Sequence, residues 1–540
     1  EKENLTIEGK TVNIRHIISH GRKYNFSVTQ RGGSDKIGPP SCISAAKERA
    51  ALDFRADRSF YITGNGVPCY IKTRHAAGSG RERGEGEDME KGMVLFDRRR
   101  LIRLIVPLVV EQVLAVTVGM ADMVMASGAG EAAVSGISLV NTICVLLIVV
   151  FSSLASGGSV VTAQYLGSGD KDTACHAAEQ LVMICGITAL AIGAFSFLGN
   201  RTILRLVYGS VEADVMDFAV TYFFITSLSF PFLGIYNACA ALFRVMGNSN
   251  ISMVASFIMN LLNIVGNAVF VYVFDMGVAG VALSTLISRF VAGAILLGLI
   301  HRPAYEVHCT KWLRVGWDVP ILKKIFSIGV PQALENSMFQ IGKLLTQSMI
   351  AGFGTASIAA NACAMTVEQL AYMPGSAMGL AMTTVIGQCV GADAYPQARK
   401  YTKKLILTAY MFLWILNIVI LLVAPLIAGY YNLSPEAYGM AVTVIRYHSV
   451  CCMLVWPLAF TLPNAMRSAG DAKFTMSVGV SSMWIGRIAM AYLIGVHFGV
   501  GLLGVWIAQT LDWVIRSVFY VVRFHGHKWE EKSLVRSPAA

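Results

Sequence analysis

The sequence predicts an all-α polytopic membrane protein in which twelve transmembrane helices form two pseudo-symmetric six-helix bundles around a central cleft. Apolar side chains make up 55% of the 540 residues and charged side chains only 14%, whereas soluble proteins carry about 25% charged residues. From Leu101 onward, apolar stretches of membrane-crossing length follow one another, and the second half of the chain repeats the pattern of the first. This composition excludes a soluble multidomain enzyme and a secreted disulfide scaffold.

The first part of the chain, residues 1–92, is a charged head with little apolar periodicity. Residues 1–100 contain 19 Lys and Arg and 13 Asp and Glu, against 25 and 20 in all the rest. No methionine precedes Met89, and the run GRERGEGEDM implies purine-rich codons like those of a ribosome-binding site. We therefore expect residues 1–88 to be disordered or a mistaken upstream extension of a protein that starts at Met89 or Met93; the alternative is a cytoplasmic regulatory domain. A peptide from residues 11–60 in native protein would contradict the upstream extension.

Twelve segments have the length and apolar character needed to cross a membrane, which takes about 20 residues each. They lie near residues 101–127, 133–165, 180–200, 214–242, 251–274, 278–300, 325–351, 357–390, 404–428, 437–464, 475–497 and 500–524. The first six belong to a predicted N-terminal lobe (93–300) and the last six to a C-terminal lobe (325–524). A cytoplasmic loop (301–324) joins the lobes, and a cytoplasmic tail (525–540) follows.

Basic residues outside the spans orient these helices. We count 21 Lys and Arg on the side of the N-terminus, among them Arg244 and Arg467, but only Arg201 and Arg205 on the other side. Because Lys and Arg accumulate in cytoplasmic loops, both termini are predicted to be cytoplasmic and the protein to lie in the plasma (inner) membrane. The net charge of +11 therefore requires no nucleic-acid partner. The cysteines lie mostly in apolar runs without CxxC spacing, which indicates free thiols rather than a metal site.

An internal repeat relates the two lobes. Residues 101–176 align with residues 325–400 without a gap, and 14 of the 76 pairs are identical. The identities include Pro107 with Pro331, Glu111 with Glu335, Gln164 with Gln388 and Gly167 with Gly391, and further along the chain Arg244 and Gly247 match Arg467 and Gly470. Six helices per half give parallel repeats, an arrangement typical of transporters that open alternately to the two sides of the membrane.

Acidic residues inside the predicted spans are candidates for function, because a charge in hydrocarbon costs at least about 2.5 kcal/mol on insertion scales. They are Glu111 and Asp122 in the first span, Glu335 in the seventh, Glu368 in the eighth and Asp512 in the twelfth. Asp122 lies eleven residues after Glu111, on nearly the same helix face and roughly 16 Å away along the axis. A carboxylate in such surroundings can carry a proton or bind a monovalent cation.

Amide and cationic residues add to this polar set. Asn263 and Asn267 in the fifth span lie on one helix face, and Thr285 in the sixth span can join them. Amide oxygens suit Na⁺, although bonding between helices is their commoner use. Arg289 and Arg487 fall near mid-span and can line a lumen together with Glu111, Glu335 and Glu368. Arg516 follows Asp512 by four residues, which predicts a pair on one helix face.

The chain resembles the multidrug and toxic compound extrusion (MATE) family of cation-coupled antiporters. The resemblance rests on IVPLVVEQVLAVTVGMADMVMASGAG in the first span, VVTAQYLGSGDKDTA after the second, FRVMGNS before the fifth, and VPQALENSMFQIGKLL and TTVIGQCVGADAYPQA in the second half. It covers all twelve spans. It implies two six-helix bundles around a central cleft, and expulsion of drugs or metabolites in exchange for H⁺ or Na⁺.

Within the family the chain is closer to the branch resembling the DNA-damage-inducible F proteins than to the NorM branch. In the former branch an acidic residue of the first span couples cation to substrate, and the matching position is Asp122. The cation cluster of that branch maps further onto Asn263, Asn267 and Thr285, although several members have aspartate in place of Asn267. The NorM branch uses an aspartate in the tenth span, whereas the tenth span here has Arg446 and no carboxylate.

These features predict a secondary transporter rather than an enzyme, because the sequence has no Walker A, HExxH or GxSxG motif. The function expected is export of drugs or small organic metabolites, coupled to H⁺ in preference to Na⁺, with no cofactor. The partners expected are membrane lipid and a small organic cation or amphiphile, and the protein is expected to be a monomer. The alternatives are a flippase or exporter for an anionic or lipid-linked metabolite, and a non-transporting membrane scaffold or sensor.

Overall fold

The computed structural model describes residues 2–7, 10–15, 60–62, 69–71, 95–127, 130–209, 211–310 and 316–535. The chain divides into two units, Glu1–Gly92 and Met93–Ala540. In the first unit, β1 (Lys2–Ile7) pairs antiparallel with β2 (Lys10–Arg15), and β3 (Phe60–Ile62) with β4 (Cys69–Ile71). The expectation about the origin of the head concerns residues that lie mostly outside the described ones, and it stays a prediction.

The described part of the second unit contains twelve helical rods, which confirms the predicted fold class. The first six are α3 (Arg98–Ser127), α4 (Glu131–Gly167), α5 (Lys171–Tyr208), α6 (Ala213–Leu228) with α7 (Phe230–Val245), α8 (Ser249–Asn267) with η2 (Ala268–Val273), and α9 (Gly277–Ile300). The last six are α10 (Val319–Ala351), α11 (Thr355–Gly391), α12 (Tyr395–Tyr430), α13 (Pro435–Trp456) with η3 (Pro457–Thr461) and α14 (Leu462–Ser468), α15 (Ala472–Ser482) with η4 (Met483–Ala489) and η5 (Ala491–His497), and α16 (Leu502–His525). A short 3₁₀ turn, η6 (Glu530–Lys532), follows.

Several helices extend beyond the predicted apolar segments, because side-chain caps start them earlier. Asp170 accepts a hydrogen bond from the backbone N–H of Thr173 at 3.0 Å and starts α5. This bond lowers the pKa of Asp170, since it favours the charged carboxylate. Asp318 caps α10 through the N–H of Ile321 in the same way. Polar residues after each cap, such as Lys171 in α5 and Lys323 in α10, are therefore part of the helix.

By length and apolar composition, eight of the described helical segments can cross a membrane, or nine if α6 and α7, which bend by 47° at their junction, form one span. The helices α3, α10 and α11 are not among them. All three pack at the junction of the two lobes, α3 and α11 against each other and α10 and α11 against α4. Helices that face another lobe carry more polar residues than helices that face lipid. A test of apolar composition alone therefore misses membrane-crossing helices of this kind.

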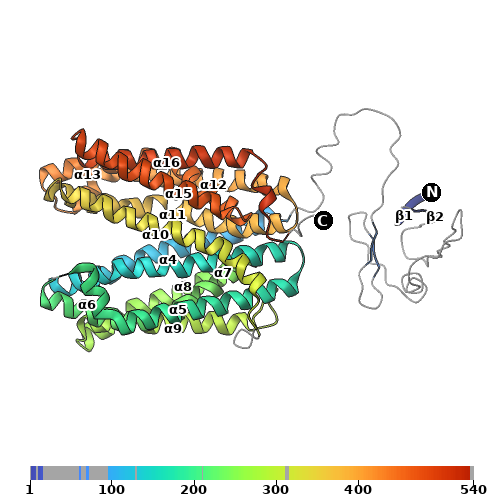
Figure 1. Ribbon diagram of the computed structural model, residues 1–540, viewed down its shortest axis with the longest axis horizontal. Helices are drawn as coiled ribbons and strands as arrows, with labels where there is room; N and C mark the ends of the chain where they lie inside the picture. Colours follow the sequence, from blue (N-terminus) through green and yellow to red (C-terminus); the bar gives the residue numbers. More distant parts are fainter. Residues whose placement is uncertain are drawn as a thin grey trace. The chain divides into compact units, whose positions relative to one another are not determined.

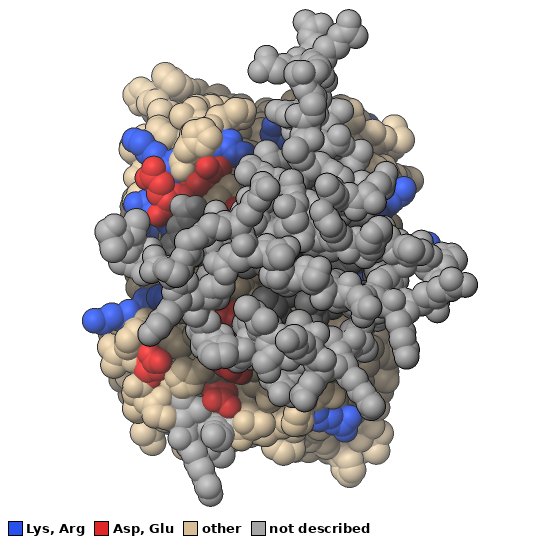
Figure 2. Space-filling view, turned by 90° about the vertical axis from the view of Figure 1, so that its right-hand side faces the viewer, with Lys and Arg blue, Asp and Glu red and all other residues tan. Residues whose placement is uncertain are grey.

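The two lobes lie side by side, with α4 and α10 running along their junction (Figure 1). The second half of α4 is almost entirely buried from Phe151 to Gln164, and so is α11 from Ala381 to Val390. The first halves of both helices are buried on one face only. The lobes are therefore packed tightly at the end where α4 and α11 terminate, which we call the closed end, and less tightly at the opposite end. Figure 2 views the closed end, and both acidic and basic side chains are visible in the part of it that is drawn in colour.

Candidate functional site

Two glutamines cross the junction between the lobes at the closed end. Gln164 in α4 donates from Nε2 to the carbonyl oxygen of Ser468 at 2.7 Å. Gln388 in α11 donates from Nε2 to the carbonyl oxygen of Val245, also at 2.7 Å. Both side chains are buried. The two glutamines match in the internal repeat, as do their two acceptors, so each lobe holds the other through the same contact. We call this pair of hydrogen bonds the glutamine clasp.

The acceptors of the clasp are carbonyls at helix ends. Val245 is the last residue of α7, and Ser468 is the last residue of α14. The last carbonyls of a helix have no hydrogen-bond partner within the helix, and burying such a carbonyl without a partner costs free energy. Gly247 and Gly470 follow with φ of 77° and 101°, values that suit glycine and stop each helix at this point. The glutamine from the other lobe thus supplies a donor that the helix itself cannot provide.

A buried ion pair lies behind each half of the clasp. Arg244 contacts Glu111 at 3.0 Å in the N-terminal lobe, and Arg467 contacts Glu335 at 2.8 Å in the C-terminal lobe. The hydroxyl of Ser252 also donates to Glu111, at 3.0 Å. Both arginines were expected to be loop cations that report orientation, whereas the structure pairs each of them with a carboxylate on a neighbouring helix. Each pair fixes the helix end whose carbonyl the opposite lobe binds.

Glycines allow the lobes to approach at the clasp. A Cβ atom on Gly391 would collide with the backbone of Gln164, and a Cβ atom on Gly167 would collide with the backbone of Gln388. In the second half of α4, a Cβ atom on Gly157 would lie 2.7 Å from the backbone nitrogen of Gly329 in α10. Such contacts leave no room for side chains, so the closed end forms only with glycine at these positions.

Three of the four predicted cation-coupling residues lie together in the N-terminal lobe. The Nδ2 of Asn263 donates to Oγ1 of Thr285 at 3.2 Å, and the Nδ2 of Asn267 donates to Oδ1 of Asn263 at 3.4 Å. All three are buried. The fourth, Asp122, belongs to α3, which packs against α8, but its side chain lies outside the described residues. The role of this group therefore stays a prediction.

A charged network occupies the corresponding part of the C-terminal lobe. Asp512 contacts Arg516 at 2.8 Å and Arg487 at 3.2 Å, which confirms the predicted pairing of Asp512 with Arg516. Arg516 also reaches Glu335, at 3.7 Å. Arg487 is 2% exposed, and its guanidinium lies 4.8 Å from the ring centre of Phe339. In the register of the repeat, Arg487 and Asp512 match Asn263 and Ser288, so the lobes differ in charge where they agree in fold.

The other predicted polar residues have hydrogen-bond partners of their own. Glu368 in α11 is buried and accepts a hydrogen bond from Gln509 at 2.8 Å. Arg289 in α9 donates to the hydroxyl of Ser229 at 2.8 Å, at the junction of α6 and α7. The structure thus joins Glu335 and Arg487 in one network and places Glu111 in a separate ion pair in the other lobe.

The family model MatE matches the chain twice, over residues 107–269 and 331–493. The chain belongs to the MatE family. The two matches begin at the paired Pro107 and Pro331 and are equally long, which agrees with the repeat seen in the sequence and with the paired contacts of the clasp.

Individual relatives match the chain over a larger share of its length than the MatE family model does. The chain is 27% identical over 442 residues to the uncharacterized transporter YisQ of Bacillus subtilis, covering 80% of this chain and 95% of that protein. It is 25% identical to the probable multidrug resistance protein NorM of Thermotoga maritima, covering 81% and 94%. Among solved structures, a transporter from Pyrococcus furiosus matches with a TM-score of 0.72 at 21% identity, covering 81% of this chain and 97% of that one.

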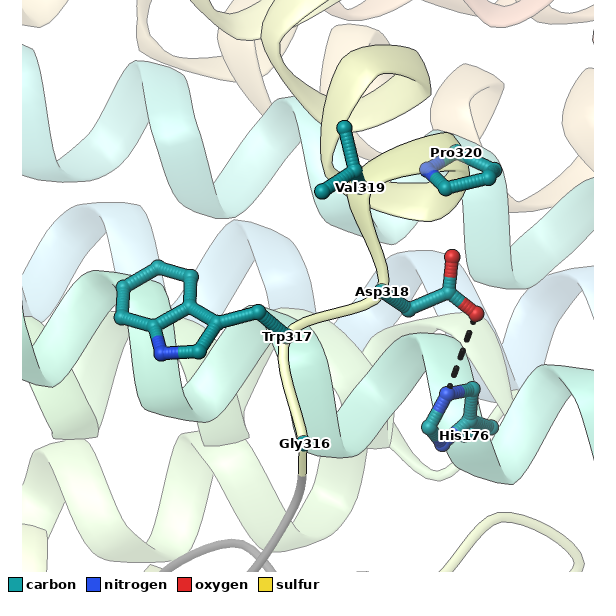
Figure 3. A pocket seen from close by; sticks show the side chains of 6 residues that line it. All are labelled: His176, Gly316, Trp317, Asp318, Val319 and Pro320. Carbon is teal, nitrogen blue, oxygen red and sulfur yellow. Dashed lines mark ion pairs between the residues drawn. The ribbon is translucent and has the colours of Figure 1, made fainter.

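A surface hollow lies where the connection between the lobes enters α10 (Figure 3). It is lined by His176, Gly316, Trp317, Asp318, Val319 and Pro320. His176 Nε2 lies 3.2 Å from Asp318 Oδ2, the carboxylate that also caps α10. This contact ties the start of α10 to α5 of the other lobe. The hollow lies outside the clasp, and the sequence had not indicated it.

Sequence reasoning missed the clasp of this MatE protein, although it found the residues. Gln164, Gln388, Arg244 and Arg467 all emerged as positions where the two halves agree. Their shared presence in both repeats was the available signal that they act in pairs. The partners across the lobes were not visible, because Gln164 and Ser468 are separated by 304 residues.

Replacing Gln388 by alanine is expected to weaken the closed end. A cysteine at Ser468, whose side chain is buried there, should react about fivefold faster with a membrane-impermeant maleimide, the factor expected from losing one net hydrogen bond of about 1 kcal/mol. The parent with the cysteine alone gives the baseline for native thiols. Gln347→Ala is the matched control, since exposed Gln347 bonds Asn361 within one lobe. Equal labelling of Gln388→Ala and this control would contradict the clasp.

Proposed function

We propose that this protein exports drugs or small organic metabolites from the cytoplasm by alternating access, in exchange for H⁺ in preference to Na⁺. Family membership supports secondary transport without a cofactor. The observation that carries the proposal is the glutamine clasp, because it joins the two lobes at one end by hydrogen bonds that can break and re-form while each lobe stays folded. The expected substrate is an organic cation or amphiphile, and the expected form is a monomer in contact with lipid.

The orientation proposed places the closed end and both termini in the cytoplasm of a plasma membrane. Its support is the set of basic residues near the ends of helices on this side, which include Lys171, Lys324 and Arg399. Removing Arg244 and Arg467 from the count leaves the excess of basic residues on this side intact. The structure then corresponds to a state closed towards the cytoplasm.

The coupling site proposed is Asp122 with Asn263, Asn267 and Thr285. Proton coupling is preferred to Na⁺ because Asn263 Oδ1 already accepts a hydrogen bond from Asn267, and because the cluster of amides and a hydroxyl carries no negative charge of its own. A single carboxylate with neutral neighbours suits proton transfer better than Na⁺ coordination, which favours several oxygen ligands. The absence of any Asp or Glu between residues 437 and 464 in the tenth span supports the N-terminal site over a C-terminal one.

In the proposed cycle, Asp122 takes up a proton in the outward-facing state, and the accompanying rearrangement of the N-terminal lobe releases substrate. The clasp then opens, the protein faces the cytoplasm, and substrate binding accompanies loss of the proton. Coupling requires only that proton and substrate favour the two states differently.

Asp122→Asn is expected to abolish efflux driven by a pH gradient, because the amide cannot bind or release the proton. The measurement is uptake of a fluorescent organic cation into proteoliposomes under separately imposed pH and Na⁺ gradients, with protein amount checked by gel. Asp214→Asn is the matched control, since it makes the same change at an exposed position in the first turn of α6 and should retain pH-driven transport. Full pH-driven efflux by Asp122→Asn would refute the assignment.

An anionic substrate is the second candidate, and the charge of the C-terminal lobe favours it. Four cationic side chains of this lobe interact with only three carboxylates among the described residues near them. The cations are Arg467, Arg487, Arg516 and the half-buried Lys343, and the carboxylates are Glu335, Glu368 and Asp512. The Pyrococcus furiosus transporter is described as having a binding pocket of reverse polarity that suggests a different function. Transport of an anionic dye but not of a cationic one in the same proteoliposomes would select this candidate.

A further inference from the structure

The segment that follows α16 folds back across the closed end. Residues 526–535, which we call the tail strap, leave α16 at Gly526 and run towards the junction of the lobes. A Cβ atom on Gly470 would collide with the backbone carbonyl of Lys532. The tail strap therefore lies directly on the turn after α14, the same turn whose Ser468 carbonyl accepts the hydrogen bond of Gln164.

The end of the tail strap binds the glutamine clasp itself. The backbone N–H of Leu534 donates to Oε1 of Gln164 at 2.9 Å, and the hydroxyl of Ser533 lies 3.5 Å from the same oxygen. Gln164 thus donates to the C-terminal lobe with its nitrogen and accepts from the tail strap with its oxygen. The equivalent Gln388 donates to the carbonyl oxygen of Val245. Of the two glutamines, the described residues of the strap form their hydrogen bonds with Gln164, so the two halves of the clasp differ in this respect.

Leu534 also covers the apolar contact between the lobes. Its side chain packs on a buried group made of Val160 in α4, Ile328 in α10 and Ala472 in α15. Val160 belongs to the N-terminal lobe and the other two to the C-terminal lobe. A side chain that packs on both lobes at once loses part of its buried area when they separate, and this opposes separation.

The other end of the tail strap is anchored in the C-terminal lobe alone. Trp529 is fully buried, stacks on Phe524 with ring centres 5.6 Å apart, and packs at the edge of Tyr395. Arg399 in α12 contacts Glu530 at 2.6 Å. Burial disfavours the charge of Glu530, but hydrogen bonds from Arg399 and His527 outweigh this effect and lower its pKa. The tail strap thus has a fixed end and an end that contacts the moving junction.

We propose that the tail strap is a conformational brake: it stabilises the state closed at this end, and Leu534 must leave the junction before the lobes separate there. The anchor at Trp529 keeps the strap on the C-terminal lobe, while Ser533 and Leu534 detach from Gln164 of the N-terminal lobe. The brake adds a regulatory element to the proposed transport cycle, but its contacts do not depend on which ion or substrate is carried.

The first test measures the closed end directly in the full-length protein in liposomes. With Ser468→Cys as the reporter, Leu534→Asn is expected to increase labelling by an impermeant maleimide on this side about fivefold, because one apolar contact across both lobes is lost. Glu531→Asn places the same residue at an exposed position of the same segment and is expected to label at the parent rate. Labelling of Leu534→Asn at the rate of Glu531→Asn would overturn the brake.

The second test locks the tail strap onto the junction instead of weakening its contact there. Val160→Cys with Leu534→Cys places two thiols in the contact that joins strap and α4. Oxidation to a disulfide is expected to stop transport, and a reductant is expected to restore it, while the parent treated identically keeps its rate. Cross-linked protein that transports at the parent rate would overturn the proposal. Labelling at Ser468→Cys reports conformation rather than transport, so a failure of the proposed function and a failure of the brake give different results.

Discussion

Replacing Gly391 by leucine is expected to abolish transport while leaving both lobes folded. The new side chain would meet the backbone of Gln164 in the other lobe, and forcing atoms into such a close-packed contact costs roughly 1–3 kcal/mol or more. The cost falls on the closed state, because Gly391 ends a helix of one lobe and meets the other lobe only when the end is shut. The protein is expected to remain open at this end and to label rapidly at Ser468→Cys.

The internal repeat provides a second variant that should give the same result. Gly167→Leu places the same clash on the other side of the junction, against Gln388, and should give the same loss. Gly429→Leu is the matched control, since a Cβ atom at Gly429 meets nothing within 4 Å. Both variants are measured for dye transport and for thermal unfolding in detergent. Normal transport by Gly391→Leu, or a loss shared by Gly429→Leu, would contradict the role of the close approach.

Arg467→Ala is expected to give the largest loss of stability of any single substitution considered. The change leaves the carboxylate of Glu335 buried with only Arg516 at 3.7 Å as a cationic partner among the described residues. Removing one member of a buried ion pair typically costs about 3–5 kcal/mol. The double variant Arg467→Met with Glu335→Gln should recover much of this loss, because no charge then remains unpaired at this position.

The measurement for the ion pair is the midpoint of thermal unfolding in detergent and the yield of folded protein. Arg302→Ala provides the control, because Arg302 is exposed in the connection between the lobes and an exposed charge contributes little. Similar unfolding temperatures for Arg467→Ala and Arg302→Ala would show that the pair with Glu335 does not hold the helix end. Failure of the double variant to recover would attribute the loss to packing rather than to charge.

The twelve helices and their repeat were predictable because they depend on local properties of the chain. Apolar length determines where a helix crosses, and the register of the repeat is visible in matched positions such as Gln164 and Gln388. The helices α5 and α10 begin before the predicted apolar segments, since the caps Asp170 and Asp318 extend each helix into polar sequence. The pattern of apolar residues indicates which part of a helix lies in lipid. The residue at which the helix starts in polar sequence depends instead on a single capping side chain.

The ion pairs of Arg244 with Glu111 and of Arg467 with Glu335 were not predictable, because each joins residues far apart in sequence. Arg244 and Glu111 are separated by 133 residues, and nothing local distinguishes an arginine bound to a carboxylate from one bound to water. Arg487 was expected near a lumen, which stays a prediction, and its contact with Asp512 on α16 had not been indicated by the sequence. A count of charges indicates which side of the membrane a loop occupies, but not which charges neighbour one another.

The acceptors of the glutamine clasp are main-chain carbonyls, and this has a consequence for how the two halves could diverge. A carbonyl is present whatever residue carries it, so position 245 can be valine and position 468 serine without loss of the contact. The hydrogen bonds of the clasp therefore constrain the side chains of the two glutamines but not the side chains of their acceptors. The charge inside each half can change without removing a main-chain acceptor.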